Sequence, residues 1–142
     1  MTLYTGDIAR QKRADVSTVS TGGPTWFGSI HTRDAPLADG PGSNASVVGR
    51  VMDVGFKVTA ETENTWYTYM IFLFKNGSRF NGSTLQIGGL NTPTDAEWAI
   101  LGGTGNLTMA RGIVRRNLTR NDGTTQYKVY AYYTPMPFVG VS

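Results

Sequence analysis

Cysteine is absent from this 142-residue chain, and histidine occurs once, as His31. Without cysteine the protein can form no disulfide bond, no thiolate metal site and no cysteine nucleophile. A single histidine rules out a multi-histidine metal centre and limits any histidine-based triad to one built around His31. We therefore expect neither a metal nor a cofactor, and we interpret His31 as a strand or hairpin-end residue.

The sequence also lacks the signs of secretion and of a membrane span. Residues 1–4 show no charged segment followed by an apolar one, so no signal peptide is visible. The longest strongly apolar run, residues 70–74, is far too short to cross a bilayer. We expect a cytoplasmic protein without membrane association, or an apoplastic one if a signal was removed. Five sequons, which we interpret as turn residues of a cytosolic protein, begin at Asn44, Asn76, Asn81, Asn106 and Asn117.

Strong charge of either sign is missing as well, since the formal net charge is only +3. The basic residues gather in two small groups, within residues 10–13 and 111–120. Nucleic-acid binding needs a denser basic surface with aromatic side chains between the charges. We interpret both groups as solvated strand faces and turn flanks, and we expect no nucleic-acid partner.

What the chain does contain is glycine and strand-forming residues. Eighteen glycines and six prolines separate segments rich in Thr, Val and Tyr, a pattern typical of strands joined by turns. Eight strands at hairpin spacing indicate an all-β fold, an eight-stranded antiparallel up-and-down β-barrel, which leaves no exposed sheet edge. The predicted strands lie near residues 2–9, 25–34, 46–61, 65–75, 83–89, 97–101, 107–119 and 124–134.

Two further segments bear on the surroundings of this barrel. Residues 65–74 are apolar on both faces over their second half, so we expect a homo-oligomer, a dimer or a trimer, to cover the outside. Residues 135–142 contain two prolines one residue apart, and proline cannot donate to a strand ladder. We therefore divide the chain into one barrel domain, residues 1–134, and the start of a linker, residues 135–142.

The glycine-rich residues 102–105 do not match a dinucleotide-binding fingerprint, because Thr108 occupies the third glycine position and no helix is predicted after it. We interpret them as a hairpin turn. Aromatic residues make up 11% of the chain. They fit either packing inside the barrel or a stacking surface for sugar rings and phenols.

Several segments resemble the plant dirigent proteins, β-barrels that steer the stereochemistry of phenoxy-radical coupling. Residues 80–85 (FNGSTL) and 102–112 (GGTGNLTMARG) are similar to the late hairpins of that family. Residues 3–8 (LYTGDI) are similar to its opening strand, with Gly6 in place of a histidine, and residues 34–37 (DAPL) to its Asp-x-Pro-Leu turn. The resemblance runs almost end to end and implies the same barrel.

The resemblance also implies which lumen residues would carry catalysis. In catalytic dirigents, aspartates, tyrosines and an arginine act on a bis-quinone methide intermediate by acid–base catalysis and orientation. This chain keeps only the first aspartate, as Asp7, so we expect no proton relay and no enzyme activity. The other positions hold Gly55 and Lys57 for two tyrosines, Asn91 for the second aspartate, and Asp95 and Ala96 near the arginine.

Within the family, the chain most resembles the dirigent-like first domain of monocot chimeric jacalins, which precedes a mannose-type jacalin lectin domain. The missing signal, the missing cysteines and the prolines of residues 135–137 agree with that placement. This resemblance implies a part in plant defence and, in one branch, the aggregation of β-glucosidases.

A lumen without its catalytic residues would leave a polar pocket. The resemblance implies that Gly55 and Lys57 face inward, and strand alternation then places Asp53 and Val51 on the same inner face. Gly55 would make room there for a ligand. A polyhydroxylated ligand would suit such a pocket beside an aromatic wall, although Asp53 and Lys57 could instead neutralise each other. The residues predicted to form it are Asp7, Asp53, Lys57, Asn91, Trp98 and Tyr127.

We therefore predict a non-catalytic, carbohydrate-binding domain of plant defence that binds a short oligosaccharide. One alternative is a true dirigent protein that steers phenoxy-radical coupling. The other is a protein-interaction module with a partner such as a β-glucosidase.

Overall fold

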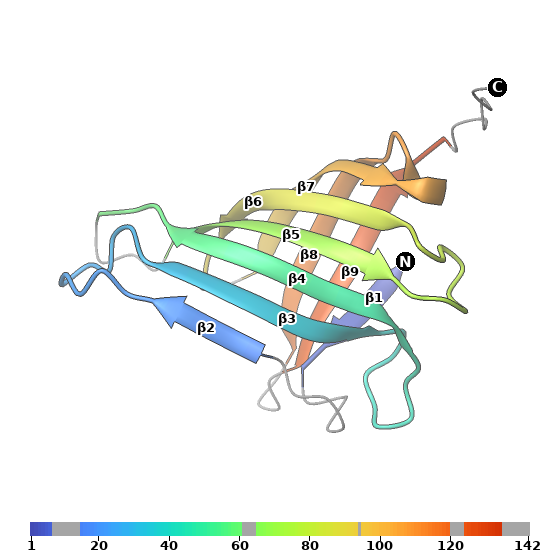
Figure 1. Cartoon of the computed structure of the whole chain (residues 1–142), viewed down its shortest axis with the longest axis horizontal. Helices are drawn as coiled ribbons and strands as arrows, with labels where there is room; N and C mark the ends of the chain where they lie inside the picture. The colour runs from blue at the N-terminus through green and yellow to red at the C-terminus, as the bar shows by residue number, and fades with distance from the viewer. Residues whose placement is uncertain (7–14, 61–64, 94, 120–123, 135–142) are drawn as a thin grey trace.

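The computed structural model describes residues 1–6, 15–60, 65–93, 95–119 and 124–134 (Figure 1). These residues form strands and one short 3-10 helix, η2 (Gly105–Leu107). The strands are β1 (Thr2–Thr5), β2 (Asp15–Val19), β3 (Ile30–Ala38), β4 (Val47–Lys57), β5 (Trp66–Phe74), β6 (Thr84–Asn91), β7 (Ala96–Thr104), β8 (Arg111–Thr119) and β9 (Thr124–Tyr132).

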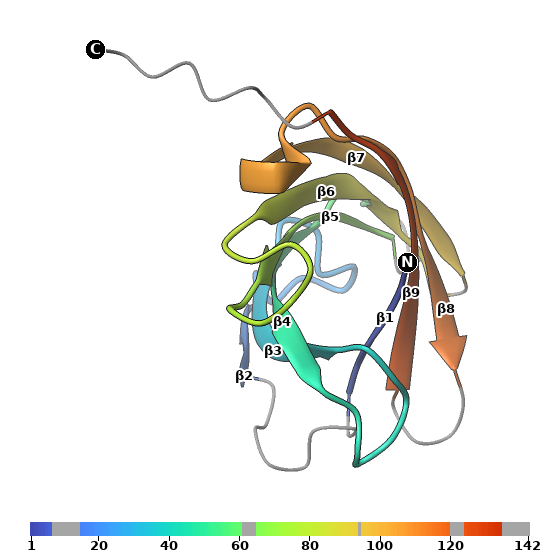
Figure 2. The same ribbon diagram turned by 90° about the vertical axis from the view of Figure 1, so that its right-hand side faces the viewer.

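The strands wrap into a closed antiparallel barrel, which Figure 2 shows from one end. From β3 to β9 each strand pairs with its neighbour in the chain, as in a series of hairpins. The barrel closes because β1 pairs with β9 on one side and with β3 on the other. The predicted eight-stranded antiparallel barrel is thereby confirmed, with β2 as an additional strand.

The strand pairing by which β1 closes the barrel covers only a few residues. β1 pairs with β9 over residues 2–5, but it meets β3 at one position only, where Tyr4 lies opposite Ala38. Farther along the same edge of β3, β2 takes over, pairing from Asp34 to Ile30. Within the described part of the chain, β2 has no pairing with β9. Among the described residues, strand pairing therefore closes the barrel at one end only.

The first predicted strands differ from those observed. The strand expected at residues 2–9 ends at Thr5, and residues 7–9 lie outside the described residues. The strand expected at residues 25–34 begins only at Ile30, because two turn hydrogen bonds place Trp26 in the left-handed region, with φ of 60°. β2 was missed because its two valines, Val16 and Val19, stand three positions apart, so the segment has no apolar alternation.

The glycine-rich turn was also misplaced. Gly102 and Gly103 continue β7, and the chain turns later, through η2. A Cβ on Gly103 would lie 2.3 Å from the Leu107 carbonyl oxygen, so this glycine permits a close approach of two backbones. The strand predicted from residue 107 therefore begins at Arg111.

Alternation along β4 fixes the inside of the barrel. Its buried positions include Val51, Asp53, Gly55 and Lys57, as predicted, and the side chains between them are more exposed. Apolar side chains form one buried core cluster. The members that are almost inaccessible to solvent include Leu37, Val51, Phe72, Leu85 and Ile87. The described residues include no helix long and apolar enough to span a membrane.

Candidate functional site in the barrel lumen

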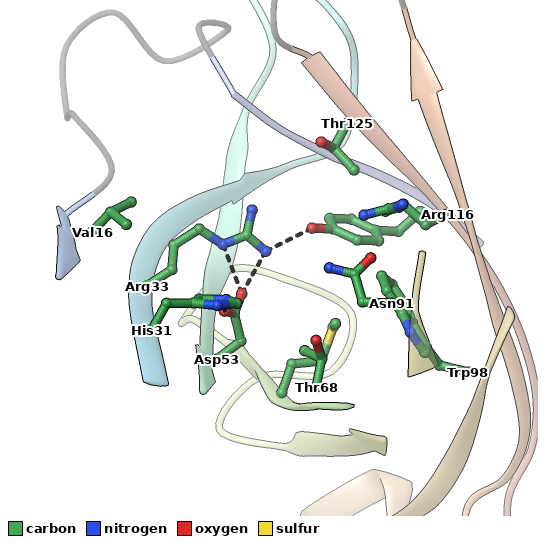
Figure 3. A pocket seen from close by; sticks show the side chains of 11 residues that line it. Val16, His31, Arg33, Asp53, Thr68, Asn91, Trp98, Arg116 and Thr125 are labelled. Carbon is green, nitrogen blue, oxygen red and sulfur yellow. Dashed lines mark hydrogen bonds and ion pairs between the residues drawn. The ribbon is translucent and has the colours of Figure 1, made fainter. Parts of the chain in front are cut away.

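A cavity of about 210 Å³ opens at the end of the barrel where β3, β5, β7 and β9 begin. Side chains from most of the barrel strands reach into it, as Figure 3 shows. Its lining residues are Val16, His31, Arg33, Asp53, Thr68, Met70, Asn91, Trp98, Arg116, Thr125 and Tyr127.

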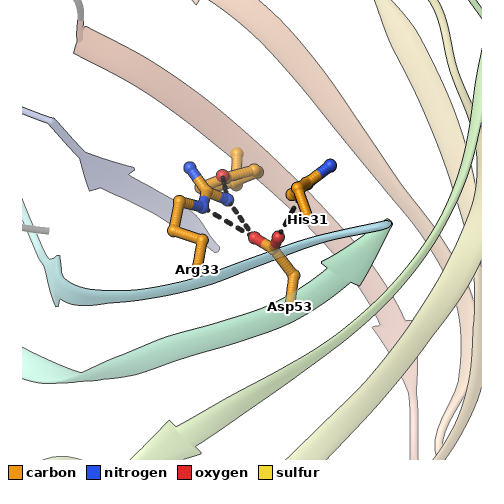
Figure 4. Close-up of polar contacts among 4 residues, drawn as sticks. His31, Arg33 and Asp53 are labelled. Carbon is orange, nitrogen blue, oxygen red and sulfur yellow. Dashed lines mark hydrogen bonds and ion pairs between the residues drawn. The ribbon is translucent and has the colours of Figure 1, made fainter. Parts of the chain in front are cut away.

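One wall carries a carboxylate held by two basic side chains. Asp53 lies directly opposite Arg33 in the β3–β4 ladder, and its side chain is only 2% exposed. Arg33 Nε donates a 2.7 Å hydrogen bond to Asp53 Oδ2, and Arg33 Nη2 lies 2.5 Å from the same oxygen. His31 Nε2 lies 3.3 Å from the other oxygen, Oδ1 (Figure 4). The carboxylate is therefore held from both sides by residues of one neighbouring strand.

Arg33 carries this network across the lumen. Its Nη2 donates a 2.9 Å hydrogen bond to the Tyr127 hydroxyl on β9. Burial alone would lower the pKa of Arg33, but the charges of Tyr127 and Asp53 and the hydrogen bonds to both outweigh it and raise that pKa. The guanidinium therefore stays charged throughout the physiological range.

The facing wall is aromatic. The rings of Trp98 and Tyr127 lie 6.2 Å apart between centroids, tilted by 38°. Trp98 is fixed by a 2.8 Å hydrogen bond from its indole Nε1 to the Leu90 carbonyl oxygen. The Arg116 guanidinium lies 5.5 Å from the Trp98 ring centroid and donates to the Thr92 carbonyl oxygen. Burial, followed by the positive charge of Arg33, lowers the pKa of Arg116.

Some neutral polar atoms on the cavity lining are buried without a hydrogen-bond partner among the described residues. Thr68 Oγ1 and Asn91 Oδ1 are such atoms. A buried polar atom without a partner costs about 1–3 kcal/mol. A ligand with hydroxyl groups could satisfy both atoms.

A second cavity, of about 520 Å³, lies at the opposite end of the barrel. Its lining is mostly apolar and includes Leu3, Phe74, Phe80 and Tyr133. None of the predicted site residues within the described ranges line this cavity. The first cavity is therefore the better candidate for polar recognition.

A sequence model of one family, described as "Dirigent-like protein", matches residues 1–133. The chain belongs to the dirigent family. It is 31% identical over 115 residues to "Pterocarpan synthase 1" of Glycyrrhiza echinata, an alignment covering 75% of this dirigent chain and 60% of that relative. It is 28% identical over 137 residues to "Dirigent protein 11" of Arabidopsis thaliana, an alignment covering 92% of this chain and 69% of that relative.

Solved structures of the family have the same barrel. The dirigent chain superposes on the pterocarpan synthase dirigent protein GePTS1 with a TM-score of 0.79 and 25% identity, covering 99% of this chain and 87% of that one. For the pterocarpan synthase dirigent protein PsPTS1, the TM-score is 0.77 at 27% identity, and the superposition covers 94% of this chain and 93% of that one. The chain spans about 60% of the length of the two pterocarpan synthases it matches by sequence.

The dirigent lumen brings together four of the predicted site residues. Asp53, Asn91, Trp98 and Tyr127 all line the first cavity. Lys57 does not line it: the side chain is buried, and Nζ donates a 2.7 Å hydrogen bond to Thr59 Oγ1. The predicted Asp7 lies outside the described residues, as does the predicted linker at residues 135–142.

The structure corrects several interpretations of the dirigent lumen. The alternative that Asp53 and Lys57 neutralise each other is wrong, because Asp53 pairs with Arg33 and lies beside His31. The lumen also has a guanidinium, that of Arg33, which the resemblance implied it had lost. It is hydrogen-bonded to the predicted carboxylate of Asp53 and the predicted phenol of Tyr127. The prediction that the chain is not an enzyme is therefore not confirmed.

Sequence reasoning missed His31, Arg33 and Arg116. The signal for the first two was present, because Ala35 and Leu37 are core residues and positions two apart on one strand share a face. Alternation along β3 would have placed His31 and Arg33 inside the dirigent barrel.

Proposed function

We propose that the first cavity binds one small hydroxylated aromatic molecule and holds it in a fixed orientation, as a dirigent-type site. The observation that carries this proposal is the pairing of two unlike walls in one cavity. One wall is the hydrogen-bonded chain Asp53–Arg33–Tyr127, and the other is the indole of Trp98. A phenol has both features to match: a flat apolar ring and a polar hydroxyl.

The contacts of such a ligand follow from the charges. Its ring would pack against Trp98, beside the ring of Tyr127. Its hydroxyl could accept a hydrogen bond from Arg33 or donate one to Asp53. A further hydroxyl or methoxyl group would reach the unpartnered polar atoms of Thr68 and Asn91. Hydrogen bonds hold Arg33, Tyr127 and Trp98 in place before any ligand enters, so this part of the site is preorganised.

The size of the cavity supports a ligand of about one ring. A volume of about 210 Å³ is below the roughly 300–1,000 Å³ of sites for drug-sized molecules. The relatives named as pterocarpan synthases support an aromatic ligand for this barrel. We propose the steering of phenoxy-radical coupling, and any catalysis in the lumen, together with this ligand binding.

A sugar is the second candidate ligand, favoured by the same two unpartnered atoms. Thr68 Oγ1 and Asn91 Oδ1 line the cavity together with the indole of Trp98, and adjacent sugar hydroxyls need such partners beside an aromatic face. The predicted short oligosaccharide would place only about one sugar ring in the lumen. A defence-related lectin role would rest on this candidate.

Saturation-transfer NMR on the purified protein would separate the two ligands. One panel contains coniferyl alcohol and simpler phenols, and the other contains galacto-, gluco- and manno-oligosaccharides. We expect transfer to phenols, reduced in Tyr127→Phe and Asn91→Ala and unchanged in Arg50→Ala, whose side chain is exposed on the outside of β4. Transfer to a sugar alone, reduced in the same variants, would replace the phenol with the second candidate.

Silence in both panels would contradict a lumen ligand and would favour the protein-interaction module. The jacalin-type downstream domain, the β-glucosidase partner and the cytoplasmic location remain predictions. The relatives described above are named as dirigent proteins and pterocarpan synthases. None of these predictions is needed for the proposed function.

A further inference from the structure

We propose that His31 exchanges a proton with the hydroxyl group of the molecule bound in the lumen. This inference rests on the proposed function, since it assigns a chemical role within the same cavity. It turns a site that orients a phenol into one that can also ionise it.

The first support is the space that the imidazole occupies. His31 lies directly opposite Gly55 in the β3–β4 ladder. A Cβ at position 55 would stand 2.2 Å from His31 Cε1 and 2.6 Å from Nδ1, closer than atoms can approach. The ring therefore fills the volume that any side chain at position 55 would need. Gly55 does not leave an empty space for a ligand, as the sequence suggested, but admits a titratable ring.

The second support is the way the ring is held. Its Nε2 faces Asp53 Oδ1 at 3.3 Å, and its edge packs on Trp66 with 5.1 Å between ring centroids. A carboxylate beside one imidazole nitrogen orients the ring and stabilises the imidazolium once a proton arrives. Among the described residues, the polar contact of His31 is the one from Nε2 to Asp53, and Nδ1 has no hydrogen-bond partner. Nδ1 is therefore the nitrogen available to the ligand.

The third support is the set of charges that face this pair. Arg33 occupies the other oxygen of Asp53, so that the carboxylate keeps one oxygen for His31. Arg33 and Arg116 place positive charge in the same cavity, from β3 and β8, and Tyr127 reaches it from β9. These guanidinium groups favour a phenolate over a neutral phenol.

The proton transfer is balanced without any further reactant. The proton of the phenol O–H moves to His31 Nδ1, and the bonding electron pair remains on the phenolate oxygen. His31 becomes an imidazolium that faces the Asp53 carboxylate through Nε2. The reverse transfer restores the starting state after the ligand has reacted or left.

The test uses 4-nitrophenol, whose ionised form absorbs visible light. Near neutral pH, we expect the wild-type protein to raise the phenolate-to-phenol ratio of the bound probe by about tenfold over His31→Gln, which corresponds to one pKa unit. Gly55→Ala, which displaces the ring without removing it, should lower the ratio in the same way. Arg50→Gln on the outer face of β4 is the matched control and should behave as wild type.

The chain contains a single histidine, so its imidazole NMR signals belong to His31 without further assignment. In the unmodified protein, adding 4-nitrophenol should shift these signals toward the imidazolium position as phenolate forms. This measurement stands even if His31→Gln fails to fold.

Three outcomes are decisive. A raised phenolate ratio with a matching histidine shift supports the role of His31. Binding of 4-nitrophenol with an unchanged ratio in His31→Gln, or with no histidine shift, overturns that role and leaves the proposed function intact. Failure of the wild-type protein to bind any phenol overturns the proposed function, and the role of His31 with it.

Discussion

Arg33 on β3 donates a 2.9 Å hydrogen bond to the hydroxyl of Tyr127 on β9, although the two residues are 94 positions apart in the chain. β1 lies between these strands near Ala38 but has no pairing with β3 beside Arg33. The side-chain contact thus joins β3 to β9 where no described strand pairs with both. It crosses the lumen and lines the first cavity at the same time.

Arg33→Met should destabilise the protein by about 2–3 kcal/mol, because it leaves the Asp53 charge buried with only His31 beside it. The expected destabilisation is smaller than that for breaking a fully buried ion pair, since the Arg33 side chain is 25% exposed. Urea unfolding followed by circular dichroism would measure it. Arg50→Met breaks the exposed pair with Asp34 and should cost less than about 1 kcal/mol. Equal losses of unfolding free energy in the two variants would show that the Arg33 network stabilises the protein no more than an exposed ion pair does.

The effect of Arg33→Met should not change between about pH 7.5 and 9, which lies above the ordinary pKa of histidine and below those of tyrosine and arginine. A raised pKa of Arg33 in the folded state means that its contribution is complete below the unfolded value and is lost only at higher pH. Unfolding curves of both proteins across this range would check this. A difference in unfolding free energy between the two proteins that shrinks steadily from pH 7.5 to 9 would contradict the prediction.

Gly55→Ala should cost about 1–3 kcal/mol, because the new methyl group collides with the His31 ring. Combined with His31→Ala, the same substitution should cost less than half as much, since the obstacle is gone. The four unfolding free energies form a double-mutant cycle. Gly42→Ala is the control, because nothing lies within 4 Å of a Cβ there. Additive effects in the cycle would place His31 away from Gly55.

Thr68→Val should leave the free protein as stable or up to about 1 kcal/mol more stable, because Thr68 Oγ1 is buried without a partner among the described residues. The same variant should bind its phenol about three- to tenfold more weakly, since one ligand hydrogen bond is lost. Calorimetry would give both quantities. Thr84→Val, which breaks a 2.7 Å hydrogen bond to Thr104, should destabilise the protein without affecting binding. Unchanged affinity in Thr68→Val would remove this residue from the site.

Self-association should use the outer face of β3–β6. Ile30, Phe56, Tyr67 and Leu90 lie opposite one another on successive strands, and each is between 37% and 54% exposed. An apolar row of this kind is typical of a protein interface. We expect analytical ultracentrifugation to show a homo-oligomer that Leu90→Lys dissociates. Tyr132→Lys, at an 85% exposed position on β9, should leave it intact. A monomeric wild-type protein at micromolar concentration would contradict the prediction.

Much of the barrel could be predicted because its information is local. Alternation along β4 placed Asp53 and Gly55 inside, and turn residues between strands fixed the hairpin order. β2 was not predicted because its two valines are three positions apart and show no alternation. Residues 102–105 were misread because glycine serves both turns and close backbone approaches, and the sequence does not distinguish the two.

The sequence by itself determined the strand content, the family and the inward face of β4, because alternation and turn chemistry act over a few residues. Only the tertiary structure decided the chemistry of the lumen. It paired Asp53 with Arg33 and His31 instead of Lys57, and it placed the His31 ring over Gly55. These choices depend on the register between strands and on contacts across a closed barrel. These contacts join residues that are far apart in the chain, and no local sequence pattern encodes such contacts.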